Sequence, residues 1–376
     1  TRRVRIPVAA NLEDAKMNEL TVWPCDALTR VFPNDPAPRN AAAAARRGWN
    51  LAGARGEYIT FQIGLRTDAP PEAITAEVRP PRPRGGDELP AEAVRVRWVH
   101  LVPVPMDSFD PAGAERPELV PGWHPDPLLE GPPWTHVASE TATSMSRSTA
   151  LHVTLRIPVD ARPGTYRGQV TVRAGNRVAA RLPVSVTVWP VEMPAPTFHV
   201  TNWFQADCIA MWHRCEPWSK RYWRLLELHG RDMAEHRQDA IATPGFVANF
   251  HNCHRLTTVD AVKTKDGGWR FDVRRLARWV KLFDRLGFRL FELWHLAAQG
   301  HGQTCPPFTY LDEATGRDVT RRGLSTGSRE YRRLVAAFLG ALQTWCDRRR
   351  ISDRFLLHVF DEPRREEWPR YARLSA

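Results

Sequence analysis

The feature that most limits the possible folds is a change in hydrophobic periodicity near residue 195. Before that point, apolar and polar residues alternate with period two in short runs, such as residues 92–99. Turn residues separate these runs, and Gly175-Asn176 lies between two of them as in a hairpin. Many short strands with Pro and Gly between them predict a β-sandwich over residues 1–195. The Pro-rich stretch 190–196 is expected to link it to a second domain.

After residue 195, strand-like segments alternate with amphipathic helices. Apolar residues recur at helical spacing within 219–238, 272–286 and 328–348. Ser219 and Asp272 stand at the starts of the first two segments, where helices are commonly capped. The strand-like segments between them are 200–204, 240–244, 288–294 and 355–360. Because strand–helix alternation requires parallel pairing, we expect an α/β domain over residues 196–376.

The net charge of +11 does not indicate a nucleic-acid partner. Only five of the 53 basic residues are Lys, and the Arg residues are scattered among acidic ones, so we expect no nucleic-acid binding. No apolar run reaches the ~18 residues that a membrane-spanning helix needs, so no membrane span is expected. The N-terminus does not read as a signal peptide. Export is slightly favoured if such a segment was removed, and otherwise a cytoplasmic location is expected. The oligomeric state is left open.

The sharpest candidate for catalysis is the acidic pair Asp361-Glu362, which directly follows the strand-like segment 355–360. Active groups of parallel α/β folds gather at the carboxyl ends of strands. Two carboxylates crowded together beside apolar walls suit general acid–base chemistry. The alternative is structural, because either acid would also serve to cap a helix beginning at Pro363.

Polar and aromatic residues follow the other strand-like segments and supply candidate substrate-binding residues: Asn202, Trp203, Trp294, His295 and His358. Tryptophan rings pack against the C–H faces of sugars, but they also pack against loops, and both readings stay open. His358 would either orient a carboxylate or be a buried core histidine. Strand alternation places it on the face opposite Asp361 unless the strand end twists.

Nothing in the sequence indicates a metal centre. His251 and His254 lie close together, but no further ligands follow at a recognisable spacing. The six cysteines include no C-x-x-C pair, which argues against both a zinc ribbon and a disulfide framework. We therefore expect no metal ion.

Four segments in order along the chain resemble glycoside hydrolase family 123: residues 55–62, 123–129, 163–168 and 360–363. The resemblance implies a β-sandwich followed by a (β/α)8-type barrel. It also implies a retaining, substrate-assisted hydrolase of β-linked N-acetylgalactosaminides in glycans, without metal or organic cofactor. In that scheme Asp361 would orient the 2-acetamido group of the substrate, and Glu362 would be the general acid and base.

The barrel is expected to be truncated. A full barrel takes about 250 residues, whereas residues 197–376 contain strand-like segments for about four strands. We therefore expect a fragment whose hydrolytic activity alone is doubtful. Two other functions stay open: a non-catalytic carbohydrate-binding protein, and a glycosidase for a different sugar.

Overall fold

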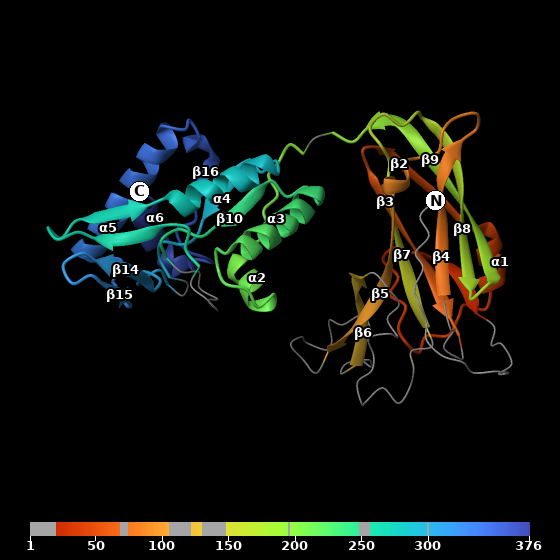
Figure 1. Ribbon diagram of the computed structural model, residues 1–376, viewed down its shortest axis with the longest axis horizontal. Helices are drawn as coiled ribbons and strands as arrows, with labels where there is room; N and C mark the ends of the chain where they lie inside the picture. The colour runs from red at the N-terminus through yellow and green to blue at the C-terminus, as the bar shows by residue number, and fades with distance from the viewer. Residues whose placement is uncertain are drawn as a thin grey trace. The chain divides into compact units, whose positions relative to one another are not determined.

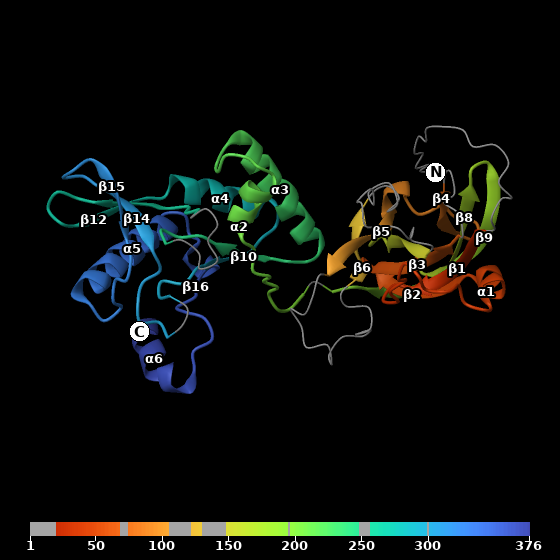
Figure 2. The same cartoon turned by 90° about the horizontal axis from the view of Figure 1, so that it is seen from below.

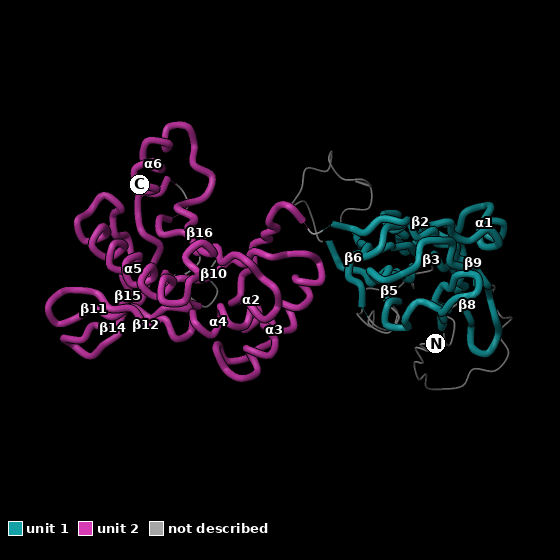
Figure 3. The backbone as a smooth tube through the Cα atoms, turned by 90° about the horizontal axis from the view of Figure 1, so that it is seen from above, with its two compact units in different colours: residues 1–195 teal, residues 196–376 magenta. Residues whose placement is uncertain are grey.

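The computed structural model divides the chain into two units, Thr1–Ala195 and Pro196–Ala376, coloured separately in Figure 3. The part of the chain that the structure describes contains sixteen strands and six α-helices, so it is mostly β-sheet (Figure 1). The described residues are 20–67, 74–104, 122–129, 148–194, 196–247, 256–298 and 301–376.

The first unit contains two β-sheets. One is antiparallel throughout, in the order β1 (Thr21–Asp26), β3 (Tyr58–Arg66), β7 (Ser148–Arg156), β5 (Val94–Val104) and β6 (Gly122–Leu129). The other has the order β2 (Trp49–Arg55), β9 (Arg177–Glu192), β8 (Gly164–Ala174) and β4 (Ile74–Pro83), with β2 parallel to β9. A helix, α1 (Ala41–Arg47), and a 3₁₀ turn, Ala91–Ala93, complete the described elements of this unit.

One hydrophobic core joins the two sheets of the first unit. Ile63 and Val153 contribute from the first sheet and Val170 and Val186 from the second, and all four side chains are fully buried in one cluster. The alternating pattern of the sequence therefore produces a two-sheet sandwich, as expected. The predicted hairpin at Gly175 is confirmed, because β8 and β9 pair on either side of it and its φ is +54°.

Gly64 in β3 has no room for a side chain. A Cβ atom built there would lie 2.1 Å from the buried ring of Trp23, its partner across the β1–β3 ladder. We expect Gly64→Ala to lower the free energy of unfolding of the first unit by about 1–3 kcal/mol, measured by calorimetry. As a matched control, Gly340 in α5 (Arg329–Asp347) has no atom within 4 Å of its Cβ position. Gly340→Ala should be neutral or stabilise by up to about 1 kcal/mol. Equal effects of the two substitutions would contradict the packing argument.

The second unit is built on a short parallel sheet, in the order β10 (Ala240–Thr243), β13 (Leu290–Leu293) and β16 (Phe355–Leu357). Thr201 adds a single parallel bridge to Ala240 at the β10 edge. The other described helices are α2 (Ala206–Trp212), α3 (Lys220–Glu235), α4 (Arg274–Arg285), α6 (Trp368–Ser375) and two 3₁₀ turns, Ser352–Arg354 and Arg365–Glu367. None of the helices in the described ranges is both long and apolar enough to cross a bilayer.

The (β/α)8-type barrel is not confirmed. The parallel sheet of the described residues is open and has three strands, because the segment predicted as the first strand, 200–204, contributes only the bridge at Thr201 before the chain enters α2. Closing a parallel sheet into such a barrel takes eight strands. What the structure supports is a parallel α/β sheet without closure.

One of the two predicted caps, Ser219, is confirmed, and Ser328 caps a helix in the same way although it was not predicted as a cap. The Ser219 hydroxyl accepts a hydrogen bond from the backbone N–H of Tyr222 at the start of α3. The Ser328 hydroxyl does the same for Tyr331 at the start of α5. These bonds satisfy backbone donors that have no partner within the first turn of a helix.

A second sheet of this unit was not predicted from the sequence. Its order is β12 (Trp269–Asp272), β11 (Asp260–Lys263), β14 (Phe308–Asp312) and β15 (Arg317–Arg321). Figure 2 shows it beside α5, and the residues of α5 and β12 are in contact. Its strands are four or five residues long and carry charged residues, so their alternation was too short to recognise.

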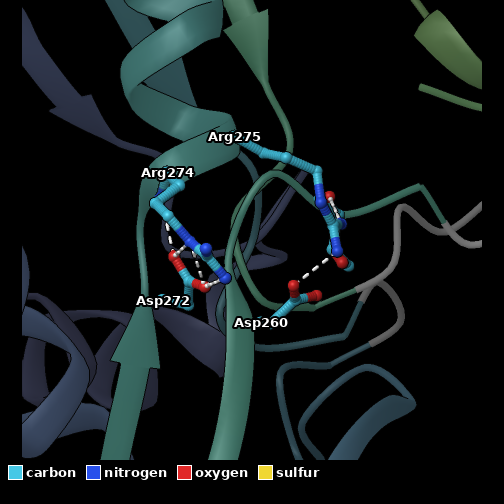
Figure 4. Close-up of polar contacts among 5 residues, drawn as sticks. Asp260, Asp272, Arg274 and Arg275 are labelled. Atoms are coloured by element: carbon cyan, nitrogen blue, oxygen red, sulfur yellow. Dashed lines mark hydrogen bonds and ion pairs between the residues drawn. The ribbon is translucent and has the colours of Figure 1, made fainter. Parts of the chain in front are cut away.

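Ion pairs join this sheet to the start of α4 (Figure 4). The Asp272 carboxylate accepts from the backbone N–H of Arg274 at 2.9 Å and pairs with the guanidinium of the same residue. Arg275 pairs with Asp260 and donates to the carbonyl of Thr257 at 2.8 Å. The helix begins two residues later than the predicted cap, but Asp272 still binds its first backbone N–H.

Candidate active site

The candidate site lies where β13 and β16 end. Beyond the last residue of β16, the backbone N–H of His358 donates to the carbonyl of Leu293 at 3.1 Å. The N–H of Ala297 donates to the carbonyl of Val359, also at 3.1 Å. The two segments therefore stay side by side past the regular strands, which places the residues after β13 next to those after β16.

Four aromatic side chains that the sequence singled out form one cluster, the ring cluster: Trp203, Trp294, His295 and His358. The imidazole centroids of His295 and His358 are 4.2 Å apart. The Trp203 ring lies 5.3 Å from Trp294, 5.8 Å from His295 and 5.5 Å from His358. Trp294 and His295 are buried, whereas Trp203 is 43% exposed, so Trp203 has ring surface available to a ligand. Sugar binding by these residues stays a prediction.

The acidic pair, Asp361 and Glu362, follows β16 and begins next to the ring cluster. One ligand atom each from His295, His358 and Asp361 lie within 4.8 Å of one another, so His358 and Asp361 are on the same side after all. The alternation of side chains along a strand does not apply to these two residues, because β16 ends at Leu357, before both of them. Asp361 is partly buried and Glu362 is exposed. Glu362 has a φ of +44°, a left-handed conformation that is uncommon for residues other than glycine.

Helix capping does not explain the acidic pair. The first helical turn after the pair begins at Arg365, with Arg364 as its N-cap, and not at Pro363. The carboxylate that accepts the Arg364 N–H, at 2.8 Å, belongs to Glu367. The same buried Glu367 pairs with His301. The capping alternative is therefore wrong for Asp361 and Glu362.

Glu292 is a site residue that sequence reasoning missed. One of its carboxylate oxygens lies 3.0 Å from Nδ1 of His358, and the other accepts from the Thr201 hydroxyl at 3.1 Å. These contacts hold the pKa of Glu292 below its usual range, with the hydrogen bond to His358 as the largest cause. The sequence did contain a signal, because Glu292 is an ionisable residue inside the apolar strand β13. Burying a charged side chain is costly unless that side chain is paired.

Burial, with a smaller contribution from the neighbouring His358, lowers the pKa of His295 to about 4. The charges of Asp361 and Glu292 act in the opposite direction but do not offset the burial. His295 is therefore neutral at neutral pH, and its ring is a polar group that adds no charge beside Asp361.

Asn202 is placed near the ring cluster by its backbone. Its carbonyl accepts a hydrogen bond from Nε2 of the buried Gln238 at 3.1 Å, and Gln238 also donates to the carbonyl of Ala240 at 3.0 Å. Gln238, also missed in the sequence, thus fixes the segment before Trp203 to β10. Asn202 itself is exposed. His251 and His254, weighed as metal ligands, lie outside the described residues.

The fold and the site define a two-domain protein whose α/β unit carries carboxylates and histidines at the carboxyl edge of a parallel sheet. Residues 203–374 match the family model described as "Glycoside hydrolase 123, catalytic domain". The second unit therefore belongs to glycoside hydrolase family 123, as the sequence resemblance indicated.

A solved structure of a family 123 glycoside hydrolase from Clostridium perfringens, described in connection with glycolipid glycan hydrolysis, has a similar fold. The TM-score is 0.70 at 14% identity, over 95% of this chain and 60% of that one, so this chain spans less than two thirds of that protein. A CARDB domain from Pyrococcus furiosus is 11% identical over 46% of this chain and 97% of its own, with a TM-score of 0.18. No curated protein matches the sequence significantly.

Proposed function

We propose that the protein is a glycosidase that cleaves terminal β-linked N-acetylgalactosaminides by a retaining, substrate-assisted mechanism. The observation that carries the proposal is the acidic pair of Asp361 and Glu362 next to the ring cluster, within a unit that belongs to family 123. The two carboxylates occupy different environments, one partly buried and one exposed. Such a difference is what two carboxylates with separate roles require.

In the first step, the Asp361 carboxylate accepts a hydrogen bond from the N–H of the 2-acetamido group. This bond orients the acetamido oxygen to attack the anomeric carbon, while the bond from that carbon to the leaving oxygen breaks. Glu362 donates its proton to the leaving oxygen. The negative charge of Asp361 also stabilises the positive oxazolinium ring that forms.

In the second step, water opens the oxazolinium ring. The Glu362 carboxylate accepts a proton from the attacking water, and the new bond forms at the anomeric carbon on the face that the aglycone left. Two inversions at one carbon give net retention, and no protein nucleophile is required. The proton gained by Glu362 restores the acid for the next turnover.

The ring cluster would hold the sugar. Trp203 offers an exposed ring face for the C–H surface of the sugar, and Trp294 packs behind it. Glu292 holds His358 at Nδ1, so the orientation of the His358 ring is fixed before a substrate arrives. A site positioned in advance loses less entropy when it binds its substrate.

The test is hydrolysis of p-nitrophenyl β-N-acetylgalactosaminide, with the matched p-nitrophenyl β-galactoside as control. We expect release of p-nitrophenol from the first and none from the second, because only the first carries the acetamido nucleophile. Cleavage of the galactoside would contradict the role of Asp361 and indicate a glycosidase for a different sugar. Saccharide binding without any turnover would indicate a carbohydrate-binding protein.

A further inference from the structure

We propose that His295, His358 and Asp361 form a binding site for a divalent transition-metal ion of the zinc type, and that an ion bound there blocks the proposed active site. Metal binding stands on the geometry alone, whereas the blocking effect rests on the proposed function. Nothing in the local sequence spacing indicates this site, because its ligands follow two different strands, β13 and β16.

The ligand set has the chemistry and nearly the geometry that zinc prefers. Two imidazoles and one carboxylate offer atoms within 4.8 Å of one another. Zinc bonds of about 2.0–2.2 Å place tetrahedral ligands about 3.4 Å apart, so the ligands need to close by at most about 1.4 Å. Asp361 lies beyond the end of β16 and is partly buried, so its side chain is the one best placed to make this adjustment.

The groups behind the ligands favour metal binding. Nδ1 of His358 faces a carboxylate oxygen of Glu292 at 3.0 Å, so Nδ1 carries the proton and Nε2 is left as the donor to a metal. The Thr201 hydroxyl binds the other oxygen of Glu292 and fixes the carboxylate. This carboxylate–histidine arrangement orients metal-binding histidines in many proteins. The His295 ring is fixed by packing against Trp294, Trp203 and His358.

An ion in this site would compete with the sugar. Three protein ligands leave one coordination position open, which is typical of accessible zinc sites. An ion bound to Asp361 would take up much of the negative charge of the carboxylate that accepts the acetamido N–H and stabilises the oxazolinium ring. Because metal and substrate require the same carboxylate, zinc and substrate should oppose each other's binding.

Calorimetric titration of the EDTA-treated, dialysed protein with zinc chloride at neutral pH tests the binding. We expect one ion per chain, and no comparable binding of magnesium, which prefers oxygen ligands. His295→Gln and His358→Gln should each lower the affinity at least about tenfold, and Glu292→Gln by about 10–100-fold. His236→Gln, at the exposed C-cap residue of α3, is the matched control and should leave the affinity unchanged. Circular dichroism verifies that each variant is folded.

Absence of stoichiometric zinc binding by the wild type, or equal binding by folded His295→Gln and His358→Gln, would overturn the proposed site. The blocking effect is tested on p-nitrophenyl β-N-acetylgalactosaminide, where zinc should raise KM and EDTA should restore it. If the metal-free protein shows no turnover, the proposed function fails, and competition between zinc and N-acetylgalactosamine is then measured by titration. If zinc binds but neither raises KM nor competes with N-acetylgalactosamine, the proposed blocking effect is wrong.

Discussion

Glu362→Gln is expected to lower kcat on β-linked N-acetylgalactosaminides by about 10²–10⁴-fold, the usual contribution of a general acid and base. The amide can neither donate the proton to the leaving oxygen nor accept one from water. Initial rates with a p-nitrophenyl and an alkyl aglycone measure the effect. The substitution should slow the first step less for the p-nitrophenyl substrate than for the alkyl substrate, because nitrophenolate leaves readily without protonation.

The matched control for this substitution is Glu366→Gln, at an exposed residue of the following 3₁₀ turn. It removes the same charge four residues away and should leave kcat and KM unchanged. Asp361→Asn should lower the rate by about 10²–10³-fold, because the neutral amide stabilises the oxazolinium charge less. Unchanged rates in both Glu362→Gln and Asp361→Asn would exclude the proposed mechanism.

Trp279→Ala is expected to destabilise the second unit by about 3–5 kcal/mol. The Trp279 side chain is fully buried on α4, and its ring lies 4.7 Å from that of Phe283. Its indole N–H donates to the hydroxyl of Thr243 at the end of β10. The substitution would therefore open a cavity and remove a buried hydrogen bond. Differential scanning calorimetry measures the change in the unfolding transition of this unit.

The matched control is Trp212→Ala, because Trp212 is 83% exposed at the end of α2. Its effect on stability should stay within about 0.5 kcal/mol. Trp279→Ala should also perturb the candidate site, because the Thr243 carbonyl accepts the backbone N–H of Trp294 at 3.2 Å. A loss of stability no larger than that of Trp212→Ala would contradict the packing assigned to Trp279.

The elements that were predicted correctly are those specified by neighbouring residues. Ser219 caps α3 through a hydroxyl group three residues from the backbone N–H that it binds. Gly175 makes the β8–β9 hairpin through its own φ. The sheet of β11, β12, β14 and β15 was missed because its strands are short, and because its apolar residues, such as Phe271 and Tyr310, become recognisable as core only when packed against α5 and one another.

The candidate site was predicted in its residue types but not in its connections. Strand-end position correctly grouped Trp203, Trp294, His295 and His358, because the carboxyl ends of parallel strands share one edge. Glu292 and Gln238 were missed because their roles depend on partners that are distant in the sequence. Barrel closure was wrongly expected, since local alternation of strands and helices does not set the number of strands in a sheet.

The chain of contacts from Thr201 through Glu292 to His358 has a consequence for the order of folding. Its two hydrogen bonds span 91 and 66 residues, so each closes a long loop at a substantial cost in entropy. During synthesis the ribosome releases Thr201 and Glu292 well before His358 and Asp361. The residues of helices α1 to α5 and of much of the core therefore leave the ribosome before the site can form, and the site is complete only once β16 has joined the sheet.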